Sequence, residues 1–317
     1  MAGESRTTVV VALLANIAVT ATKVVAGIIG GSSAMLSEGA HSVSDTVNEL
    51  FLVASVRRSE RPADERHPFG YGAERFFWSL IAAVGIFVAG GGFSFFQAYN
   101  AFRSSEGGGH WTLNYVVLAI AAVFESVSLF RATHQIRREA AEAHRGPVEH
   151  VKVSADPALK VVASEDTIAV LGLAFAAAGV AVHQATGQGM WEGVASAAIG
   201  FLLICAAVAL ARDSMSLLIG EAVDPDLVQA IDETVSGHPM VGHLVESLTR
   251  YLGAHEVMVA VRVELVDGLT SDDIERMSSE IDDHLRALSS EITQVFVDAT
   301  TSHERRRLEA ARAEREP

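Results

Sequence analysis

The sequence predicts an α-helical membrane protein of six transmembrane helices, followed by a small α+β domain. Half of the 317 residues are hydrophobic, and they collect into segments of roughly 20 residues, the length that crosses a bilayer core. From about Glu221 these segments stop, and 17 acidic residues stand against four arginines as far as His303. We therefore expect a transmembrane domain over 1–220, a cytoplasmic domain over 221–302 and a charged tail over 303–317.

The apolar segments predict where each span lies. The first is too long for the apolar part of a signal peptide and continues directly into the second, so we interpret both as spans. The expected spans are Thr7–Ile29, Ser33–Val56, Phe76–Phe102, Thr112–Arg131, Ala158–Val182 and Met190–Ala211.

Basic residues in the short loops predict the orientation. Positively charged loops face the cytoplasm, and an even number of spans then places both termini there. The excess of Arg over Lys and the many alanines are typical of a GC-rich bacterial genome, so the expected location is the inner membrane of a bacterial cell. The basic loop residues are Arg57, Arg58, Arg61, Arg66 and Arg75 after span two, and Arg137, Arg138, Arg145, Lys152 and Lys160 after span four.

The C-terminal region alternates between helical and strand patterns. Leu227–Val235 and Ser271–Leu288 have helical spacing, whereas Leu244–Thr249, Val257–Val266 and Thr293–Val297 are strand-like. This order, α-β-β-α-β, predicts a ferredoxin-like sandwich. Its acidity argues against nucleic acid as a partner. The single cysteine, Cys205, excludes an intramolecular disulfide and a thiolate metal cluster.

A histidine and an aspartate stand out among the ionisable residues of span two. His41 and Asp45 are four residues apart, so an imidazole and a carboxylate share one helix face. Nitrogen and oxygen ligands of this kind suit zinc and neighbouring metals. Because ionisable groups at bilayer depth are costly, they usually mark an ion path.

A second acidic site lies one turn into span five. Glu165 and Asp166 follow an apolar flank that begins at Ala158, and an apolar segment follows them. A helix-end pair facing solvent is the alternative interpretation. Adjacent residues differ by about 100° around a helix, so at most one of the two faces a given partner.

Further motifs resemble the cation diffusion facilitator family of metal/proton antiporters over nearly the whole chain. Within the family, Asp156-Pro157 together with Glu165-Asp166-Thr167 is most similar to the branch that contains a mitochondrial zinc transporter. The motifs that carry the resemblance are His41-xxx-Asp45, Gly31-Ser32-Ser33-Ala34-Met35, His67-Pro68-Phe69-Gly70-Tyr71-Gly72 with Glu74, Ser216-Leu217-Leu218-Ile219-Gly220 and His238-Pro239-Met240-Val241.

The resemblance implies a transport site with two ligands from span two and two from span five. His41, Asp45 and Asp166 match three of these ligands, but Val162 stands where the fourth would be. Glu165, Glu49 or water could complete the set, although pairing with Lys23 is an equally good account of Glu49. Zinc is the first expectation, and the oxygen-rich set would also suit Mn²⁺, Fe²⁺ or Co²⁺.

The accessory metal sites of the family match less well. Asp64 and His67 form a weak loop site, because Tyr71 replaces a further histidine, and His67-Pro68 then favours a turn. In the soluble domain the family's ligand positions align with Val245, Arg262 and Val297, so no binuclear site of the usual type is expected. We interpret this domain as a dimerisation module. Its remaining histidines, which we expect at the surface, are His238, His243, His255, His284 and His303.

The expected function is zinc efflux by proton antiport, because a metal ion and protons compete for the same ligands. Glu125 in span four would carry a proton or pair with a nearby arginine. No resident cofactor is expected, since the divalent cation is the transported substrate, and no nucleophile or phosphate-binding loop suggests an enzyme. Two alternatives remain: a transporter of Mn²⁺, Fe²⁺ or Co²⁺ through the same site, and a non-transporting membrane scaffold or regulator that retains the fold.

Overall fold

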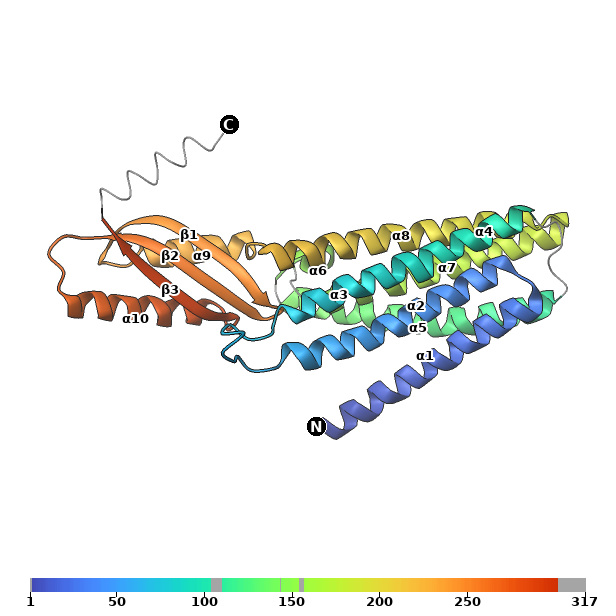
Figure 1. The fold of residues 1–317 in the computed structure, drawn as a ribbon, viewed down its shortest axis with the longest axis horizontal. Helices are drawn as coiled ribbons and strands as arrows, with labels where there is room; N and C mark the ends of the chain where they lie inside the picture. Colours follow the sequence, from blue (N-terminus) through green and yellow to red (C-terminus); the bar gives the residue numbers. More distant parts are fainter. Residues whose placement is uncertain (1, 104–109, 143, 154–156, 302–317) are drawn as a thin grey trace, which may run out of the picture. The chain divides into compact units, whose positions relative to one another are not determined.

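The computed structural model describes residues 2–103, 110–142, 144–153 and 157–301; the side chains of 2–15 and 152–164 lie outside this description (Figure 1). The predicted tail, 303–317, and Asp156 also lie outside it. The chain divides into two compact units. One comprises residues 1–60 with 74–215, and the other comprises residues 61–73 with 216–317.

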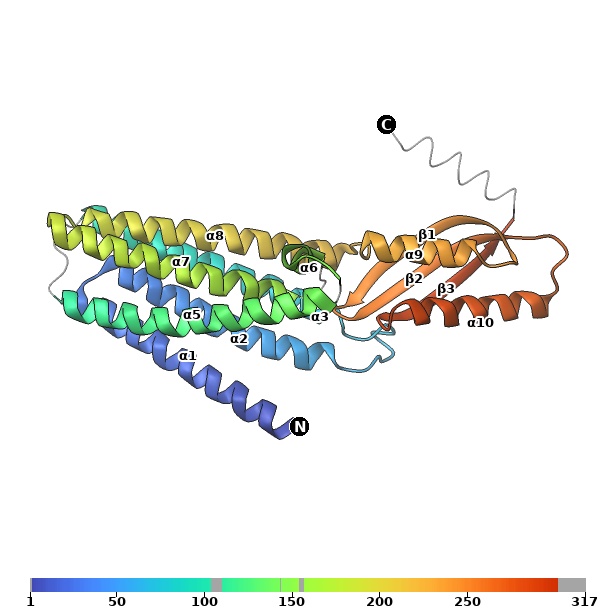
Figure 2. The same ribbon diagram turned by 180° about the vertical axis from the view of Figure 1, so that it is seen from behind.

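The first unit is helical (Figures 1 and 2). Among the described residues, four helical segments are long and apolar enough to cross a membrane: Glu74–Arg103, Trp111–Glu142, Glu165–Thr186 and Met190–Ile219. This finding confirms a helical transmembrane domain. The helices are α1 (Ala2–Gly30), α2 (Ser33–Ser59), α3 (Glu74–Gly85), η1 (Ile86–Gly92), α4 (Phe93–Arg103), α5 (Trp111–Glu142), α6 (Pro147–Val153), α7 (Pro157–Thr186) and α8 (Met190–Ile219).

Helix α2 does not meet the same criterion, because polar residues interrupt it along its length, and about half of them are buried. Ser32 caps its N-terminus by accepting a hydrogen bond from the Met35 N–H. Along its length α2 contacts α1, α3, η1, α4 and α7. These neighbouring helices cover much of its polar face, which includes Glu38, His41 and Asn48.

The predicted third span contains a π-helical segment, η1, which the sequence pattern did not indicate. Its glycines permit close approach of neighbours: a Cβ at Gly91 would lie 2.5 Å from Ile204 Cγ1, and one at Gly90 would lie 3.1 Å from Ser44 Oγ. Single π-helical turns inside α-helices often occur beside functional sites. The segment therefore packs tightly against α8 and against the polar face of α2.

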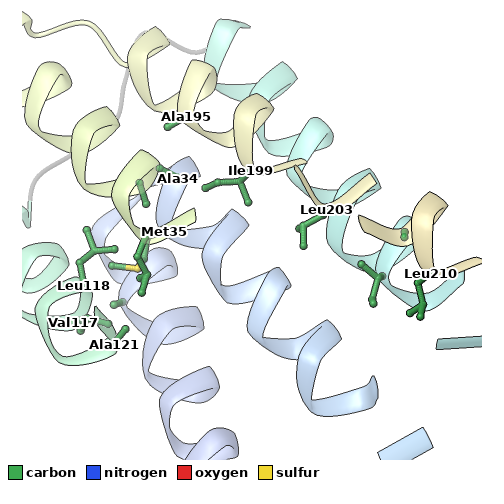
Figure 3. Close-up of a cluster of buried hydrophobic side chains, with 14 of the residues drawn as sticks. Ala34, Met35, Val117, Leu118, Ala121, Ala195, Ile199, Leu203 and Leu210 are labelled. Atoms are coloured by element: carbon green, nitrogen blue, oxygen red, sulfur yellow. The ribbon is translucent and has the colours of Figure 1, made fainter. Parts of the chain in front are cut away.

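A buried apolar cluster joins several helices of this unit. Figure 3 shows Ala34 and Met35 of α2, Val117 to Ala121 of α5, and a row along α8 that runs from Ala195 to Leu210. Many of its members are alanines. Small side chains let helix backbones approach closely, which is how helices associate in a membrane without a hydrophobic driving force.

The second unit carries the predicted order α-β-β-α-β: α9 (Pro225–Ser236), β1 (Val241–Gly253), β2 (Glu256–Leu265), α10 (Ser271–Leu288) and β3 (Ile292–Thr300). Its sheet has the order β1-β2-β3, with β1 antiparallel and β3 parallel to β2. Helix α9 packs on β1, α10 packs on β3, and the two helices touch each other, so both cover the same face. Val257, Val259, Val261 and Val263 alternate as buried residues along β2.

One histidine of this unit departs from the surface position that we expected. His238 is only 6% exposed, and its Nε2 lies 3.0 Å from Glu280 Oε2 of α10. The histidine follows directly after α9, so the pair fastens the end of one helix to the other. Arg262, which occupies a family ligand position, donates instead to Asp298 at 2.6 Å and to Glu246 at 3.3 Å on the adjacent strands.

Candidate cation site

The candidate site begins with a polar stripe on α2. Glu38 is three and four residues from His41 and Ser42, and Asp45 is four and three residues from the same two, so the four side chains lie along one helix face. Glu38, His41 and Ser42 are at most 5% exposed, and the side chain of Asp45 is 27% exposed. The stripe thus runs from a fully buried end toward an accessible one.

His41 and Asp45 face each other, as their spacing predicts. His41 Nδ1 lies 3.3 Å from Asp45 Oδ1. Both ring nitrogens of His41 are buried, yet neither has a hydrogen-bond partner in the part of the chain that is described. Buried polar groups are nearly always hydrogen-bonded, so an orphaned imidazole beside a carboxylate requires an explanation.

A small cavity adjoins this pair. Its volume of about 10 Å³ is close to the space that one water molecule or a bare ion occupies. Asp45, His41 and Glu165 supply its polar lining, and apolar side chains supply the rest. The apolar residues are Ile86 of η1, Ile168 of α7, and Leu203, Ala206 and Leu210 of α8.

A second, larger cavity of about 470 Å³ lies among α1, α2, α5 and α7, and Asp45 and Glu165 line it as well. In both ribbon views α1 diverges from α2 toward its N-terminus, and Asn16 of α1 lines this cavity (Figures 1 and 2). Because Asp45 and Glu165 line both cavities, they separate the large cavity from the small one.

The two acidic residues of α7 have different surroundings. Glu165 accepts a short hydrogen bond from Asn48 Nδ2 of α2 and lines the small cavity with His41. Asp166 accepts from Ser128 Oγ of α5 at 3.0 Å and lines only the larger of these two cavities. Its Oδ2 is buried without a hydrogen-bond partner among the described residues. The side chain of Val162 lies outside the described residues.

The predicted ligands are neighbours but not a preassembled ligand set. Within the described residues, no group of three or more His, Cys, Asp and Glu side chains is close enough to hold a metal ion. His41, Asp45 and Glu165 share a cavity, whereas Asp166 stands in the adjacent one. Coordination of one ion by three of them requires side-chain or helix movement.

Two of the other predicted charged residues, Lys23 and Glu125, form a separate cluster with Glu38. Lys23 Nζ lies 3.4 Å from Glu38 Oε2 and 3.3 Å from Glu125 Oε1. Glu49 accepts a hydrogen bond from Asn16 Nδ2 at 3.2 Å, so its partner is Asn16 and not Lys23. Glu125 therefore pairs with a lysine of α1, where the sequence suggested an arginine. Glu38 was not among the predicted residues, although it lies on the same α2 stripe.

The predicted loop pair adopts a turn. Asp64 Oδ1 accepts from the backbone N–H groups of Arg66 and His67, and its Oδ2 accepts from the Tyr71 hydroxyl. These hydrogen bonds, with the Tyr71 bond contributing most, lower the pKa of Asp64 to about 2. His67 Nδ1 lies 3.4 Å from Asp64 Oδ1. The carboxylate thus organises the loop.

One buried polar cluster was missed by sequence reasoning. Glu192 Oε1 of α8 lies 2.7 Å from His183 Nδ1 of α7, and its Oε2 accepts from Ser32 Oγ at the α2 cap. The rings of Trp111 of α5 and His183 pack perpendicular to each other, with their centroids 4.8 Å apart. Nine residues separate His183 and Glu192, with a turn between them, so no helical spacing could have indicated the pair.

Comparison with known proteins identifies the family to which this chain belongs. The sequence matches the cation efflux transmembrane domain over residues 9–219. The chain belongs to the cation efflux family of membrane transporters, which confirms the family predicted from its motifs and the expectation of a transporter and not an enzyme.

Named relatives include zinc and manganese proteins. The proton-coupled zinc antiporter SLC30A9, mitochondrial, is 30% identical over 266 residues in both Xenopus laevis and Homo sapiens, covering 82% of this chain and 47% of theirs. This chain therefore spans about half the length of those relatives. The manganese efflux system protein MneP of Bacillus subtilis is 24% identical over 299 residues, covering 92% of this chain and 95% of its own.

Proposed function

We propose that the protein exports a divalent cation, with Zn²⁺ as the first candidate, in exchange for protons. One observation carries this proposal: a buried imidazole without a hydrogen-bond partner faces Asp45 in a cavity that Glu165 also lines. Imidazole nitrogen and carboxylate oxygen are common zinc ligands. The zinc antiporter relatives support the choice of ion.

In this proposal His41, Asp45 and Glu165 bind the ion, and Asp166 receives it from the large cavity. Asp45 and Glu165 each line both cavities. An ion can therefore move from the large cavity to the small one while it stays in contact with carboxylate oxygens. Movement of Glu165 toward His41 would complete the coordination. Because metal ligands must be deprotonated, protons that reach the same groups from the opposite side of the membrane displace the ion.

The membrane arrangement is part of the same proposal. Helix α2 has 27 residues and would be about 40 Å long, enough to cross a bilayer, and α1 is longer still. With α1 and α2 as spans, the protein has six. The transmembrane domain covers 1–220, and both termini face the cytoplasm of a bacterial cell.

The second unit would then be a cytoplasmic domain over 221–302, ferredoxin-like in element order, that mediates homodimerisation. The loop 61–73, which packs within this unit, belongs with it structurally. The sheet face that α9 and α10 leave open carries Phe296, which is 47% exposed and contacts Phe69 of the loop.

A different ion through the same site is the second candidate. His41 supplies the only nitrogen ligand of the proposed set, and carboxylates supply the rest. Mn²⁺ and similar ions prefer carboxylate oxygen ligands, whereas Zn²⁺ is well suited to imidazole nitrogen. The manganese efflux relative from Bacillus subtilis supports this reading.

A third candidate is a membrane scaffold that does not transport. Its support is the absence of a ready group of three metal-binding side chains among the residues described. In that case His41 and Asp45 would be retained residues of the family's transport site that no longer bind a transported ion.

Transport by purified protein in liposomes separates the three candidates. Vesicles carry a metal-sensitive dye and an imposed pH gradient, and Zn²⁺, Mn²⁺, Fe²⁺ and Co²⁺ are compared for wild type, Asp45→Asn and Glu192→Gln. We expect flux that requires the pH gradient, is lost in Asp45→Asn and persists in Glu192→Gln, which removes a more deeply buried carboxylate elsewhere. The ranking of metals identifies the substrate. Absence of gradient-dependent flux for all four ions would favour the scaffold.

A further inference from the structure

We propose that Lys23, Glu38 and Glu125, which we name the lysine cluster, bind one proton that is released when the divalent cation binds. This inference rests on the proposed function and deepens it, because it assigns a proton site separate from the metal ligands. Its residues lie on three helices, α1, α2 and α5.

The geometry of the lysine cluster is unusual for a bilayer segment. The side chains of Lys23 and Glu38 are 0% exposed, and that of Glu125 is 21% exposed. Lys23 Nζ contacts Glu38 at 3.4 Å, Glu125 at 3.3 Å and Ser42 Oγ at 2.8 Å. The ammonium group therefore uses its three donors on two carboxylates and one hydroxyl.

The charges do not balance when all three groups are ionised. Two carboxylates around one ammonium leave a net charge of −1 in a buried site, which is costly away from water. Glu38 Oε1 is also buried without a hydrogen-bond partner, and α7 approaches it so closely that a Cβ at Gly172 would collide with it. An unpartnered anionic oxygen costs more than an unpartnered neutral one. One proton on either carboxylate removes the excess charge.

The lysine cluster has a route to water. Glu125 lines the large cavity, and Glu38 is reached only through Lys23 among the contacts described. A proton can bind at Glu125 from the cavity, or transfer to Glu38 through the shared ammonium group. The net charge changes from −1 to zero, and no other reactant is required.

Proximity links the lysine cluster to the metal site. Glu38, Ser42 and Asp45 lie on one stripe of α2, so Glu38 is about 10 Å from Asp45 along the helix axis. Lys23 holds Ser42, the residue that follows His41. A divalent cation at His41 and Asp45 favours the ionised, proton-free state of a cluster at this distance.

Several other charged groups act on the same proton. Five of them line the large cavity: Asp45 and Glu49 of α2, Arg131 of α5, and Glu165 and Asp166 of α7. The sixth is His41 of α2, which lines the small cavity. From α1 the charged member described is Lys23 itself. The lysine cluster differs from these groups because it contains its own cation.

The test counts protons released per metal ion. Zn²⁺ and Mn²⁺ are titrated calorimetrically into the full-length protein in detergent, at one pH, in buffers of different ionisation enthalpy. Wild type is compared with Glu38→Gln, with Glu125→Gln and with Glu192→Gln as a buried control. We expect metal binding in all four proteins, with about one proton fewer released in Glu38→Gln or in Glu125→Gln and no change in Glu192→Gln.

The outcomes separate this inference from the proposed function. If wild type binds no divalent cation, the proposed function is wrong. If wild type binds metal and both Glu38→Gln and Glu125→Gln release as many protons as wild type, the lysine cluster holds no exchangeable proton and the inference fails. Should Glu38→Gln not fold, Glu125→Gln, whose residue is partly exposed, decides alone.

Discussion

Among the described residues of the helical unit, two pairs of a buried histidine and a carboxylate have opposite properties. His183 and Glu192 are 2.7 Å apart, and Glu192 also accepts from Ser32, so its oxygens are occupied. His41 and Asp45 are 3.3 Å apart, and both His41 nitrogens lack hydrogen-bond partners among the described residues. A satisfied pair stabilises the ends of three helices, whereas an unsatisfied pair beside a cavity is available to a ligand.

The largest expected difference between the pairs is in metal binding. Changing a residue that only supports a metal ligand costs about 10–100-fold in affinity, so loss of a ligand itself should exceed this. We expect Asp45→Asn to weaken Zn²⁺ or Mn²⁺ binding by more than about 100-fold, measured by calorimetry. Glu192→Gln should bind as wild type does. Equal losses in both variants would erase the distinction between the pairs.

Stability should show the reverse order. Glu192→Ala removes the acceptor of His183 and Ser32, and unsatisfied buried groups cost about 1–3 kcal/mol each. We expect a clear fall in the thermal unfolding temperature of the purified protein without metal. His41→Ala also leaves a cavity but removes no hydrogen bond described, so it should lower that temperature less. A larger fall in His41→Ala would mean that His41 is structural.

The α7 acidic residues sharpen the comparison on a smaller scale. Glu165 shares the small cavity with His41, whereas Asp166 lines only the larger of the two. We therefore expect Glu165→Gln to weaken metal binding more than Asp166→Asn does, by about tenfold in dissociation constant. The opposite order would restore Asp166, which the family resemblance favours, as the ligand.

The smallest effect concerns a third pair, Asp64 and His67, in the exposed loop. The hydrogen bonds to Asp64 lower its pKa from 3.8 to about 2, so their stabilisation is complete above pH 3.8 and is lost as pH falls toward 2. At pH 7, Asp64→Asn should lower the unfolding temperature slightly and leave metal affinity unchanged. The difference between this variant and wild type should vanish near pH 2. A loss of metal affinity in Asp64→Asn would instead indicate a loop metal site.

The helices were predictable because their apolar segments are long, and the small domain because its periodicity changes from helical to strand-like. The π-helical segment was not, since the close packing of Gly90 and Gly91 depends on which residues of α2 and α8 face them. The mean hydropathy of α2 also gives a poor measure of its burial, because many of its polar side chains are covered by other helices.

The part of the site that lies on a single helix was predictable from the sequence. His41 and Asp45 follow from a four-residue spacing, but the partners of Lys23 lie 15 and 102 residues away in sequence. Likewise, the orientation of Glu165 toward His41 depends on how α7 rotates against α2. Sequence spacing fixes neighbours on one helix face, whereas contacts between helices depend on packing.

X-ray absorption spectroscopy of the Zn²⁺-loaded protein tests most directly whether His41 and carboxylates bind the cargo. We predict one imidazole nitrogen at about 2.0 Å with oxygen ligands in wild type and in His183→Gln, and loss of the imidazole signal in His41→Gln. An imidazole signal that persists in His41→Gln and disappears in His183→Gln would contradict this account.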